Sequence, residues 1–416
     1  MSCNGWDLYV LGDIAEYSKE KISIDEVNTL NYISTENMLQ DKNGVVEANS
    51  IPNSNSVPAY RAGNILISNI RPYFKKIWFA NRNGGASTDV LVIKNKSKDI
   101  ITDKFLYYYM FQDRFFDYVM SGAKGTKMPR GDKNSIMKYQ VTVPTIEEQK
   151  KIIKIFENLD QKIELNNEMN KTLEEIAQSL FKRWFVDFEF PNEDREPYKS
   201  SAGEMVESEL GMIPKGWEVK LISEVIEIKD GTHASPKPKE DGYPLITSKH
   251  ISGDKIDFKS ANLISKEDYD EVNRRSKVDT GDILISMIGT VGLIHLIQEE
   301  VIDFAIKNVG LFKTSQKDVI SEYLYLFLKS NDMKNYIEVR LAGTTQKYIS
   351  LGELRKIKFI LPSEDVINNF KVFIEKIFNK KRKNIEENDS LIELRDSLLP
   401  KLMSGEIRIE DIEANL

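Results

Sequence analysis

The sequence predicts an α+β protein in which two pseudo-symmetric mixed α/β domains are separated by two long antiparallel coiled-coil helices. Three observations lead to this prediction. The chain repeats itself at an offset of 218 residues, each copy mixes strand-like runs with helical periodicity, and each copy ends in a long stretch with heptad spacing. With 41% apolar residues in 416, the chain can bury ordinary cores in both copies.

The repeat runs without a gap from Tyr60 to Phe185. Gly63 to Ser68 falls on Gly281 to Ser286, and other pairs in register are Phe105-Leu106-Tyr107 with Tyr323-Leu324-Tyr325, Gly125-Thr126 with Gly343-Thr344, Pro144 with Pro362 and Ser179-Leu180 with Ser397-Leu398. Gly5-Trp6 matches Gly216-Trp217 at an offset of 211. A period this long is far beyond that of solenoid repeats, so each copy is expected to be a domain.

Within each copy, strand-like runs alternate with helical patterns. We expect strands at 64–70, 89–93 and 139–143, and at 283–288, 309–313 and 358–361 in the second copy. Helical periodicity covers 103–120 and 321–340. Each body is therefore predicted to be mixed α/β.

A long helix is predicted from Ile146 to about Phe185, where the sequence has neither Pro nor Gly. Apolar residues recur at spacings of four and three, among them Ile152, Phe156 and Leu159. A helix of about 38 residues would be on the order of 57 Å long. Such a helix needs a partner for its apolar stripe.

The matching stretch from about Glu364 to Leu402 is the expected partner. Asn166 and Asn170 interrupt the first apolar seam, and Asn384 and Asn388 interrupt the second at equivalent positions. A buried Asn lowers stability but selects one register, so we expect Asn166 to face Asn388 and Asn170 to face Asn384. Lys381 and Arg395 also fall on the second seam, which predicts a looser stretch there. Two amphipathic helices, each packed on its own body, remain the alternative.

These patterns divide the chain into six parts. We expect a first domain at 1–145, a long helix at 146–186, an exposed linker at 187–215, a second domain at 216–362, a second long helix at 363–404 and an acidic tail at 405–416. Because the duplication makes the two seams alike, residues 1 to about 205 are also expected to dimerise through their own helix.

Composition favours a cytoplasmic protein. Cys3 is the single cysteine, which excludes a disulfide framework, and no apolar run is long enough for a membrane span. The net charge is −7, but the excess acid lies outside the two predicted domains. Charge therefore permits a nucleic-acid partner without arguing for one.

The sequence offers no constellation for catalysis or metal binding. His233, His250 and His295 lack the spacing of a zinc site, and no Gly-rich nucleotide loop is present. Neither is the Asp/Asn-Pro-Pro-Tyr/Phe tetrapeptide of an amino-methyltransferase. Glu218 with Lys220 and Glu227 with Lys229 form Glu-x-Lys pairs of the kind found in nucleases, which a highly charged chain also produces by chance. We expect a binding protein without catalytic residues or cofactor of its own.

Candidate DNA contacts are cations and polar groups in Gly-containing loops, since such loops offer backbone N–H groups to phosphate and side chains to base edges. In the first copy they are Arg71, Lys75, Lys127, Arg130 and Lys133, with Lys76 and Lys124 nearby. In the second copy they are Lys237, Lys239, Lys249 beside His250, Thr344, Thr345, Gln346 and Lys347.

Several segments resemble the specificity subunits of type I restriction-modification systems. The segment from Gly343 to Pro362 is similar to the one that closes each of their target-recognition domains, and Pro144 with Glu148-Gln149 is similar to the start of their central helix. The run Phe181 to Phe188 resembles the end of that helix. Gly216-Trp217, Gly231-Thr232 and Thr280 to Ser286 fit the opening and middle of a recognition domain.

The resemblance implies a non-catalytic protein that reads a bipartite asymmetric sequence in double-stranded DNA, with one domain for each half. It implies methyltransferase subunits as partners, which bind S-adenosylmethionine and methylate adenine, and a translocating restriction subunit that joins them. Two departures stand out. Val366 and Ile367 replace Glu148 and Gln149 in the second copy, and 127–132 differs in sequence from 345–350.

Two other functions stay open at this point. One is a scaffold that bridges two proteins without DNA, and the other is a nuclease or methyltransferase in its own right. Salt-dependent binding to duplex DNA would distinguish the first, and cleavage or methylation by the isolated chain would reveal the second.

Overall fold

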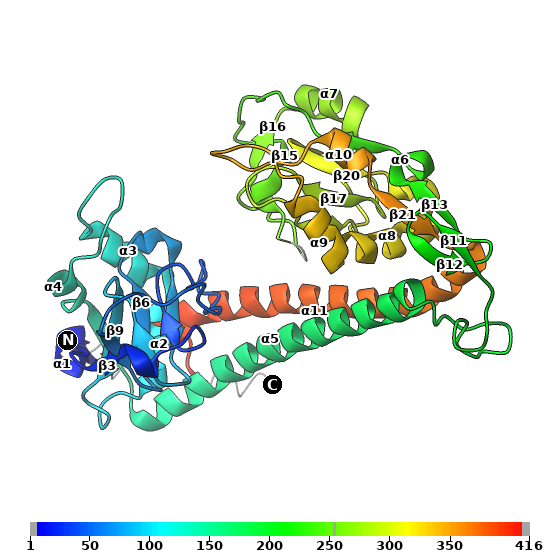
Figure 1. The fold of residues 1–416 in the computed structure, drawn as a ribbon. Coiled ribbons are helices and arrows are strands. Elements are labelled where there is room, and N and C mark those ends of the chain that lie inside the picture. Colours follow the sequence, from blue (N-terminus) through cyan, green and yellow to red (C-terminus); the bar gives the residue numbers. More distant parts are fainter. Residues whose placement is uncertain (1–5, 253–254, 410–416) are drawn as a thin grey trace. The chain divides into compact units, whose positions relative to one another are not determined.

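The computed structural model describes residues 6–252 and 255–409. Cys3, Gly5 and the end of the acidic tail, 410–416, lie outside the described residues. The chain divides into two compact units, each of which is described by itself. Unit 1 comprises the described residues up to Leu165 and those from Glu387 onward, and unit 2 runs from Asn166 to Glu386. Each unit is a mixed α/β body with part of both long helices (Figure 1).

Unit 1 is built on two four-stranded sheets, ordered β2-β9-β6-β7 and β3-β5-β8-β4, and a two-stranded ladder of β1 with β10. Its strands are β1 Asp7–Val10, β2 Ala15–Tyr17, β3 Lys21–Ser23, β4 Tyr32–Ile33, β5 Ser56–Tyr60, β6 Ile65–Ser68, β7 Ile77–Phe79, β8 Gly84–Ala86, β9 Val90–Asn95 and β10 Gln140–Val143. Its short helices are α1 Leu11–Ile14, α2 Asp103–Phe111, α3 Asp113–Ser121 and α4 Lys133–Ile136, with 3-10 turns at Ile24–Glu26 and Pro72–Phe74.

Strand β6 explains how one sheet serves two cores. Side chains alternate across a strand, so Ile65 and Ile67 point into a core shared with α2, α3 and the long helices, whereas Leu66 points into a second core with Trp78 and Val92. All these side chains except Trp78 are at most 5% exposed. The continuous apolar run in the sequence reflects burial on both faces.

Unit 2 repeats this plan. Its strands are β11 Met205–Ser208, β12 Gly211–Pro214, β13 Glu218–Leu221, β14 Ile228–Asp230, β15 Tyr243–Ile246, β16 Asn262–Ile264, β17 Ile283–Ser286, β18 Ile294–Leu296, β19 Ala305–Ile306, β20 Val309–Phe312 and β21 Lys358–Leu361. Its short helices are α6 Ile222–Val225, α7 Lys266–Ser276, α8 Ser321–Leu328, α9 Asn331–Glu338 and α10 Leu351–Arg355, with 3-10 turns at Ser248–His250 and Thr314–Ile320.

The first sheet is the same in both units, and the second sheet differs. The order β14-β20-β17-β18 matches β2-β9-β6-β7 strand for strand, and β13 pairs with β21 as β1 pairs with β10. In the second sheet of unit 1, β8 lies between β5 and β4, but in unit 2 β15 lies between β16 and β19. The two copies thus share a core and differ at one margin.

The long helices are α5, Ile146–Phe181, followed by a π-helical turn at Lys182–Val186, and α11, Glu364–Ser404. Within unit 2, Glu174 and Asn170 of α5 contact Lys381 and Asn384 of α11, and within unit 1 Asp160 contacts Arg395. In unit 2 the partner residues on α11 have lower numbers as α5 advances from Asn170 to Glu174, and in unit 1 they fall from Arg395 to Glu387 between Asp160 and Lys162. The two helices therefore pair antiparallel in each unit, and the predicted fold class is confirmed.

Two predictions about local structure were wrong. The helical runs 103–120 and 321–340 are each two helices: extended backbone at Gln112, with φ −69° and ψ 149°, ends α2, and Ser330 caps a new helix, α9, after α8. The segment 187–215 is not a bare exposed linker. Phe188 and Phe190 are buried against Trp217, and β11 and β12 form a hairpin.

No helix among residues 6–252 and 255–409 is long and apolar enough to cross a membrane.

Candidate nucleic-acid interface

A tight loop in unit 2 carries four of the predicted contact residues. Ala342 and Tyr348 exchange two backbone hydrogen bonds of 2.9 Å, which close a loop that presents Thr344, Thr345, Gln346 and Lys347 to solvent. Gly343 has a φ of +92°, and a Cβ atom there would lie 2.2 Å from the backbone oxygen of Gln346. Only glycine fits this position without distortion.

Unit 1 has the same loop with different side chains. Lys124 and Arg130 exchange two backbone hydrogen bonds of 2.9 Å, and Gly125 has a φ of +95°. Lys127 lies exposed between them. The offset of 218 residues relates every one of these positions to its counterpart in unit 2.

Both loops dock on the segment that follows a central strand. In unit 1 the N–H of Arg71 donates to the oxygen of Pro129 at 2.8 Å, and that of Gly131 to the oxygen of Asn69 at 3.2 Å. In unit 2 the corresponding bonds join Gly289 to Lys347 at 3.1 Å and Ile349 to Met287 at 3.0 Å. Different sequences thus adopt one backbone, and only the side chains presented by the two loops differ.

Two of the five candidate cations in unit 1, Lys75 and Arg130, are engaged in ion pairs. Lys75 and Lys42 form ion pairs with Asp113 at 3.0 and 2.8 Å, and Arg130 pairs with Asp89 at 3.2 Å. Burial alone would raise the pKa of Asp113, but its bonds to the two lysines lower it overall. Such pairing makes Lys75 and Arg130 weaker candidates for DNA.

Two further lysines in this region are also engaged. Lys124 pairs with Asp132 at 2.8 Å and lowers the pKa of that carboxyl to about 2, and Lys76 donates to the backbone oxygen of Thr35 at 2.6 Å. By contrast, the side chains of Lys127 and Lys133 make no ion pair with any described residue.

Arg71 is held in an unusual conformation. Its φ of 49° places it in the left-handed region, and its Nε is buried without a hydrogen-bond partner among the described residues. Arg71 is therefore a strained backbone position next to the loop.

In unit 2 the candidates gather at two clefts. Lys237 and Lys239 line one of them together with Ser265, Glu267 and Asp268. The other cleft brings together Lys249 and Gln346, which are far apart in sequence. Its remaining lining residues include Thr247, Ile288, Gly289, Thr290 and Asn308. Among the described residues, Lys237, Lys239, Lys249 and Lys347 have side chains without an ion pair.

Asn308 and Thr290 were missed by the sequence reasoning. Asn308 has a φ of 53°, and its Oδ1 lies 2.7 Å from Nδ1 of His233. The signal available in the sequence was weak, because an Asn after a strand is common in turns. His250 has a structural role instead: its Nδ1 accepts a hydrogen bond from the N–H of Thr247 at 2.9 Å, and burial lowers its pKa.

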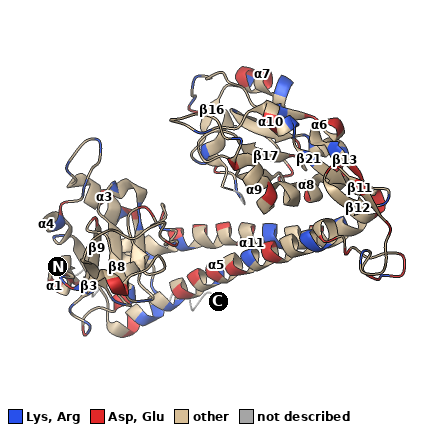
Figure 2. Cartoon of the chain, viewed as in Figure 1, with Lys and Arg blue, Asp and Glu red and all other residues tan. Residues whose placement is uncertain are grey.

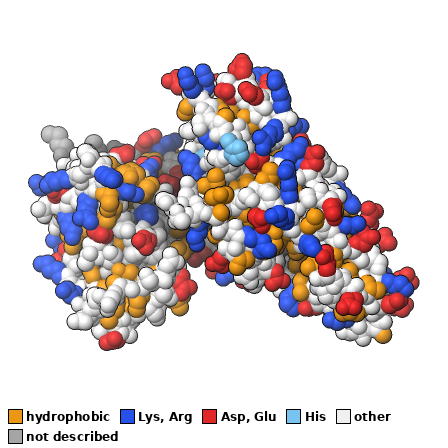
Figure 3. Space-filling model, turned by 45° about the horizontal axis from the view of Figure 1, so that its top comes forward, with side chains coloured by type: hydrophobic (Ala, Val, Ile, Leu, Met, Phe, Trp, Pro, Cys, Tyr) orange, Lys and Arg blue, Asp and Glu red, His pale blue; other side chains and the backbone are white. Residues whose placement is uncertain are grey.

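The Glu-x-Lys pairs are internally neutralised. Lys220 contacts Glu218 and Lys229 contacts Glu227, each at 2.8 Å. No group of three or more metal-binding side chains occurs within the described ranges. Lysine and arginine positions alternate with acidic ones along the cartoon, and both kinds of side chain are mixed on the visible face of the space-filling view (Figures 2 and 3).

The predicted helix-pairing residues are all buried. Asn166 and Asn384 are 0% exposed, Asn388 4% and Asn170 9%. Within unit 2, Nδ2 of Asn384 donates to Oδ1 of Asn170 at 2.8 Å. The seam is not loose at its cations: Lys381 and Arg395 are both engaged by carboxylates of α5.

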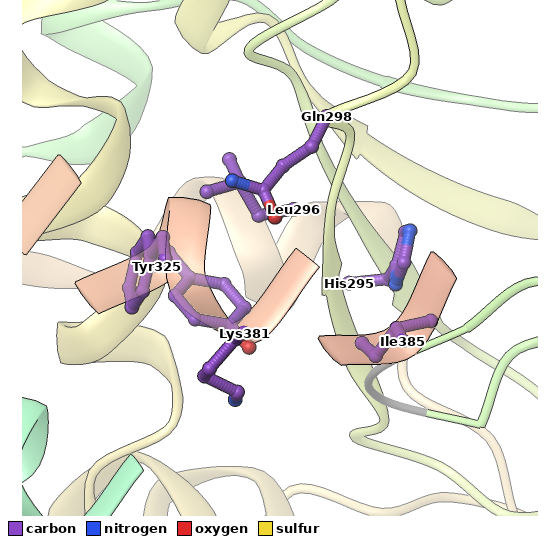
Figure 4. Close-up of a pocket in the computed structure, with 7 residues that line it drawn as sticks. His295, Leu296, Gln298, Tyr325, Lys381 and Ile385 are labelled. Atoms are coloured by element: carbon purple, nitrogen blue, oxygen red, sulfur yellow. The ribbon is translucent and has the colours of Figure 1, made fainter. Parts of the chain in front are cut away.

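A pocket beside the seam in unit 2 is lined by His295, Leu296, Gln298, Tyr325, Phe378, Lys381 and Ile385 (Figure 4). It lies where β18 and α8 meet α11, and Tyr325 packs edge-on against Phe378 with ring centroids 5.4 Å apart. Three of its lining side chains, Leu296, Tyr325 and Phe378, belong to the hydrophobic core of unit 2.

Comparison with known proteins adds a family. The model of the type I restriction modification DNA specificity domain matches residues 4–175 and 214–388. The HindI specificity subunit of Haemophilus influenzae is 30% identical over 84% of this chain and 87% of that protein. The MjaIX specificity subunit of Methanocaldococcus jannaschii is 25% identical over 76% of this chain and 71% of its own. A crystal structure of the type I restriction-modification S subunit from M. genitalium, 14% identical, shares the fold with a TM-score of 0.53 over 97% of this chain and 98% of that one.

Proposed function

This chain belongs to the family of type I restriction-modification DNA specificity proteins, and we propose that it reads a two-part target in double-stranded DNA, one part with each unit. The family is one of specificity subunits, which are not catalytic and need no cofactor themselves. The two matches to the family model, 4–175 and 214–388, fall one on each copy of the repeat. Two similar but non-identical readers suit an asymmetric target.

The observation that carries the proposal is the pair of equivalent loops. Each is closed by two hydrogen bonds, docked by two more and exposed at its tip. The loop in unit 2 offers Thr345, Gln346 and Lys347, and the loop in unit 1 offers Lys127 and Met128, with Pro129 buried beneath them. Side chains of different chemistry on one backbone would let the two units choose different bases.

The long helices supply the distance between the two parts of the target. At about 1.5 Å per residue, the 36 residues of α5 extend roughly 54 Å. DNA rises about 3.4 Å per base pair, so a spacer of that length spans on the order of 15 base pairs. A rigid pair of helices would keep the unread gap constant.

Chemistry on the DNA would belong to partner subunits. We propose that methyltransferase subunits bind this chain, carry S-adenosylmethionine and methylate an adenine in each part of the target, and that a translocating restriction subunit joins them. The neutralised Glu-x-Lys pairs favour this division of labour over a nuclease within the chain itself.

The test is selection from a pool of random duplex DNA by the full chain assembled with the methyltransferase subunits. We expect two short, unlike motifs separated by a fixed number of unspecified base pairs. A single continuous motif would contradict the two-reader proposal, and failure to retain any duplex DNA even at low salt would favour a protein-bridging scaffold instead.

A further inference from the structure

The seam between α5 and α11 contains two ion pairs of the same polarity. In unit 1, Nη1 of Arg395 on α11 contacts Oδ1 of Asp160 on α5 at 2.9 Å. In unit 2, Lys381 on α11 contacts Glu174 on α5. Both times α5 supplies the acid and α11 the cation.

The two pairs obey one register. Going from Asp160 to Glu174 advances 14 positions along α5, and going from Arg395 to Lys381 retreats 14 positions along α11. The pair in unit 1 and the pair in unit 2 therefore obey the same antiparallel numbering of α5 against α11.

These side chains are largely withdrawn from water. The exposed fraction is 11% for the side chain of Arg395, 7% for Lys381, 21% for Glu174 and 32% for Asp160. Tyr108 also donates to Oδ2 of Asp160 at 2.7 Å, and Lys329, just after α8, contacts Glu174 at 2.7 Å. Burial would raise the pKa of Glu174, but Lys329 and Lys381 lower it overall, so the carboxylate is charged at neutral pH.

The duplication identifies the residues that a second copy of α5 would place at the positions of the α11 cations. By the offset of 218, Arg395 corresponds to Ala177 and Lys381 to Ile163, both on α5. Lys329 corresponds to Phe111. A second α5 on the seam would thus place Asp160 opposite an alanine and Glu174 opposite an isoleucine.

Removing one member of a buried ion pair costs far more than the pair contributes, because a charge is left in a poorly solvated place. Two copies of α5 would bury four carboxylates without a cation, and two copies of α11 would bury four cations without an acid. The apolar residues of the seam add no charge to either pairing, although equivalent positions differ in size, as Ile152 and Phe370 do.

We propose that these two ion pairs are a pairing code that admits α11 as the partner of α5 and rejects a second α5. This argues against the expectation that residues 1 to about 205 dimerise through their own helix. It is independent of DNA binding. Lys162 of α5 also contacts Glu387 of α11 at 3.0 Å with the opposite polarity, but both side chains are over 40% exposed, and exposed pairs contribute little.

The test gives α11, in the full chain, the residues that α5 carries at the two equivalent positions. The variant is Lys381→Ile with Arg395→Ala. Hydrogen exchange of the α5 and α11 amides at pH 7 measures opening of the seam, and we expect exchange around positions 160 and 174 to accelerate about tenfold or more. Arg382→Ala, which removes a half-exposed cation paired within the same helix, is the matched control and should leave exchange unchanged.

Rescue separates charge from lost packing. Adding Asp160→Asn and Glu174→Gln to the double variant removes the stranded charges at nearly constant shape, so exchange should return to within about threefold of the wild-type rate. Wild-type exchange in Lys381→Ile with Arg395→Ala would overturn the proposal. Fast exchange that persists after adding Asp160→Asn and Glu174→Gln would also overturn it, because the seam would then have been destabilised by lost packing alone.

Discussion

Asn384 donates its Nδ2–H to Oδ1 of Asn170 at 2.8 Å, and both side chains are buried in the seam of unit 2. The amides of Asn170 and Asn384 meet only in this register of α5 against α11. A shift of one helical turn would separate them and place Asn384 opposite Asn166 or Glu174.

Asn384→Leu should therefore destabilise unit 2 by about 1–3 kcal/mol, because Asn170 is left buried without its donor. The double variant Asn170→Leu with Asn384→Leu should recover most of this loss. Denaturant midpoints followed by circular dichroism measure both. Equal instability of the single and double variants would mean that the two amides do not depend on each other.

Lys347→Ala should weaken binding to all DNA sequences about equally and flatten the dependence of log K on log salt by about one unit, as expected for one lost phosphate contact. Lys127→Ala, at the tip of the equivalent loop, should do the same. Lys75→Ala is the control, because its ammonium is already paired with Asp113. If Lys347→Ala instead changes which base is accepted, the loop reads base edges.

Gly343→Ala should distort the loop of unit 2, since its Cβ would lie 2.2 Å from a backbone oxygen at a φ of +92°. We expect DNA affinity to fall at least tenfold while the denaturant midpoint changes little, because the loop is exposed. Gly211→Ala meets the same left-handed backbone with φ +96° but no atom within 4 Å, and serves as the control. Unchanged affinity in Gly343→Ala would remove this loop from the interface.

Glu322 predicts a pH dependence for unit 2. Burial raises the pKa of Glu322 to about 7, although Lys371 at 4.0 Å opposes this. The folded state then binds more protons than the unfolded state between about pH 4.5 and 7, so stability falls as pH rises through this window. Glu322→Gln should raise the denaturant midpoint at pH 8 and leave it nearly unchanged at pH 4, whereas exposed Glu338→Gln should do neither. A midpoint that Glu322→Gln lowers at pH 8 would contradict the assignment.

Sequence reasoning reached the strands at 65–68 and 283–286 and both long helices because their signals are local: continuous apolar runs, heptad spacing and the repeat itself. It missed the break at Gln112, where a polar residue between two apolar stretches gives no warning of extended backbone. It also read Phe188 and Phe190 as part of a linker, because their partner Trp217 lies some 27 residues away and composition does not reveal contacts.

The candidate site was predicted in part. Glycine and threonine marked the loop at 343–347, but the ion pairs that occupy Lys75 and Arg130 come from Asp113 and Asp89, whose proximity depends on tertiary structure. For the same reason, the sequence predicted a loose seam at Lys381 and Arg395, because it does not reveal that carboxylates of α5 pair with them.

The central claim is that each unit reads its own part of the target, and exchange of one unit tests it most directly. Residues 217–362 would be replaced by the same region of another specificity subunit, and methylated adenines would be mapped in cells that carry the matching methyltransferase. We predict that one half of the methylated sequence changes while the other half and the length of the gap stay the same. A change in both halves, or in the gap alone, would contradict the account.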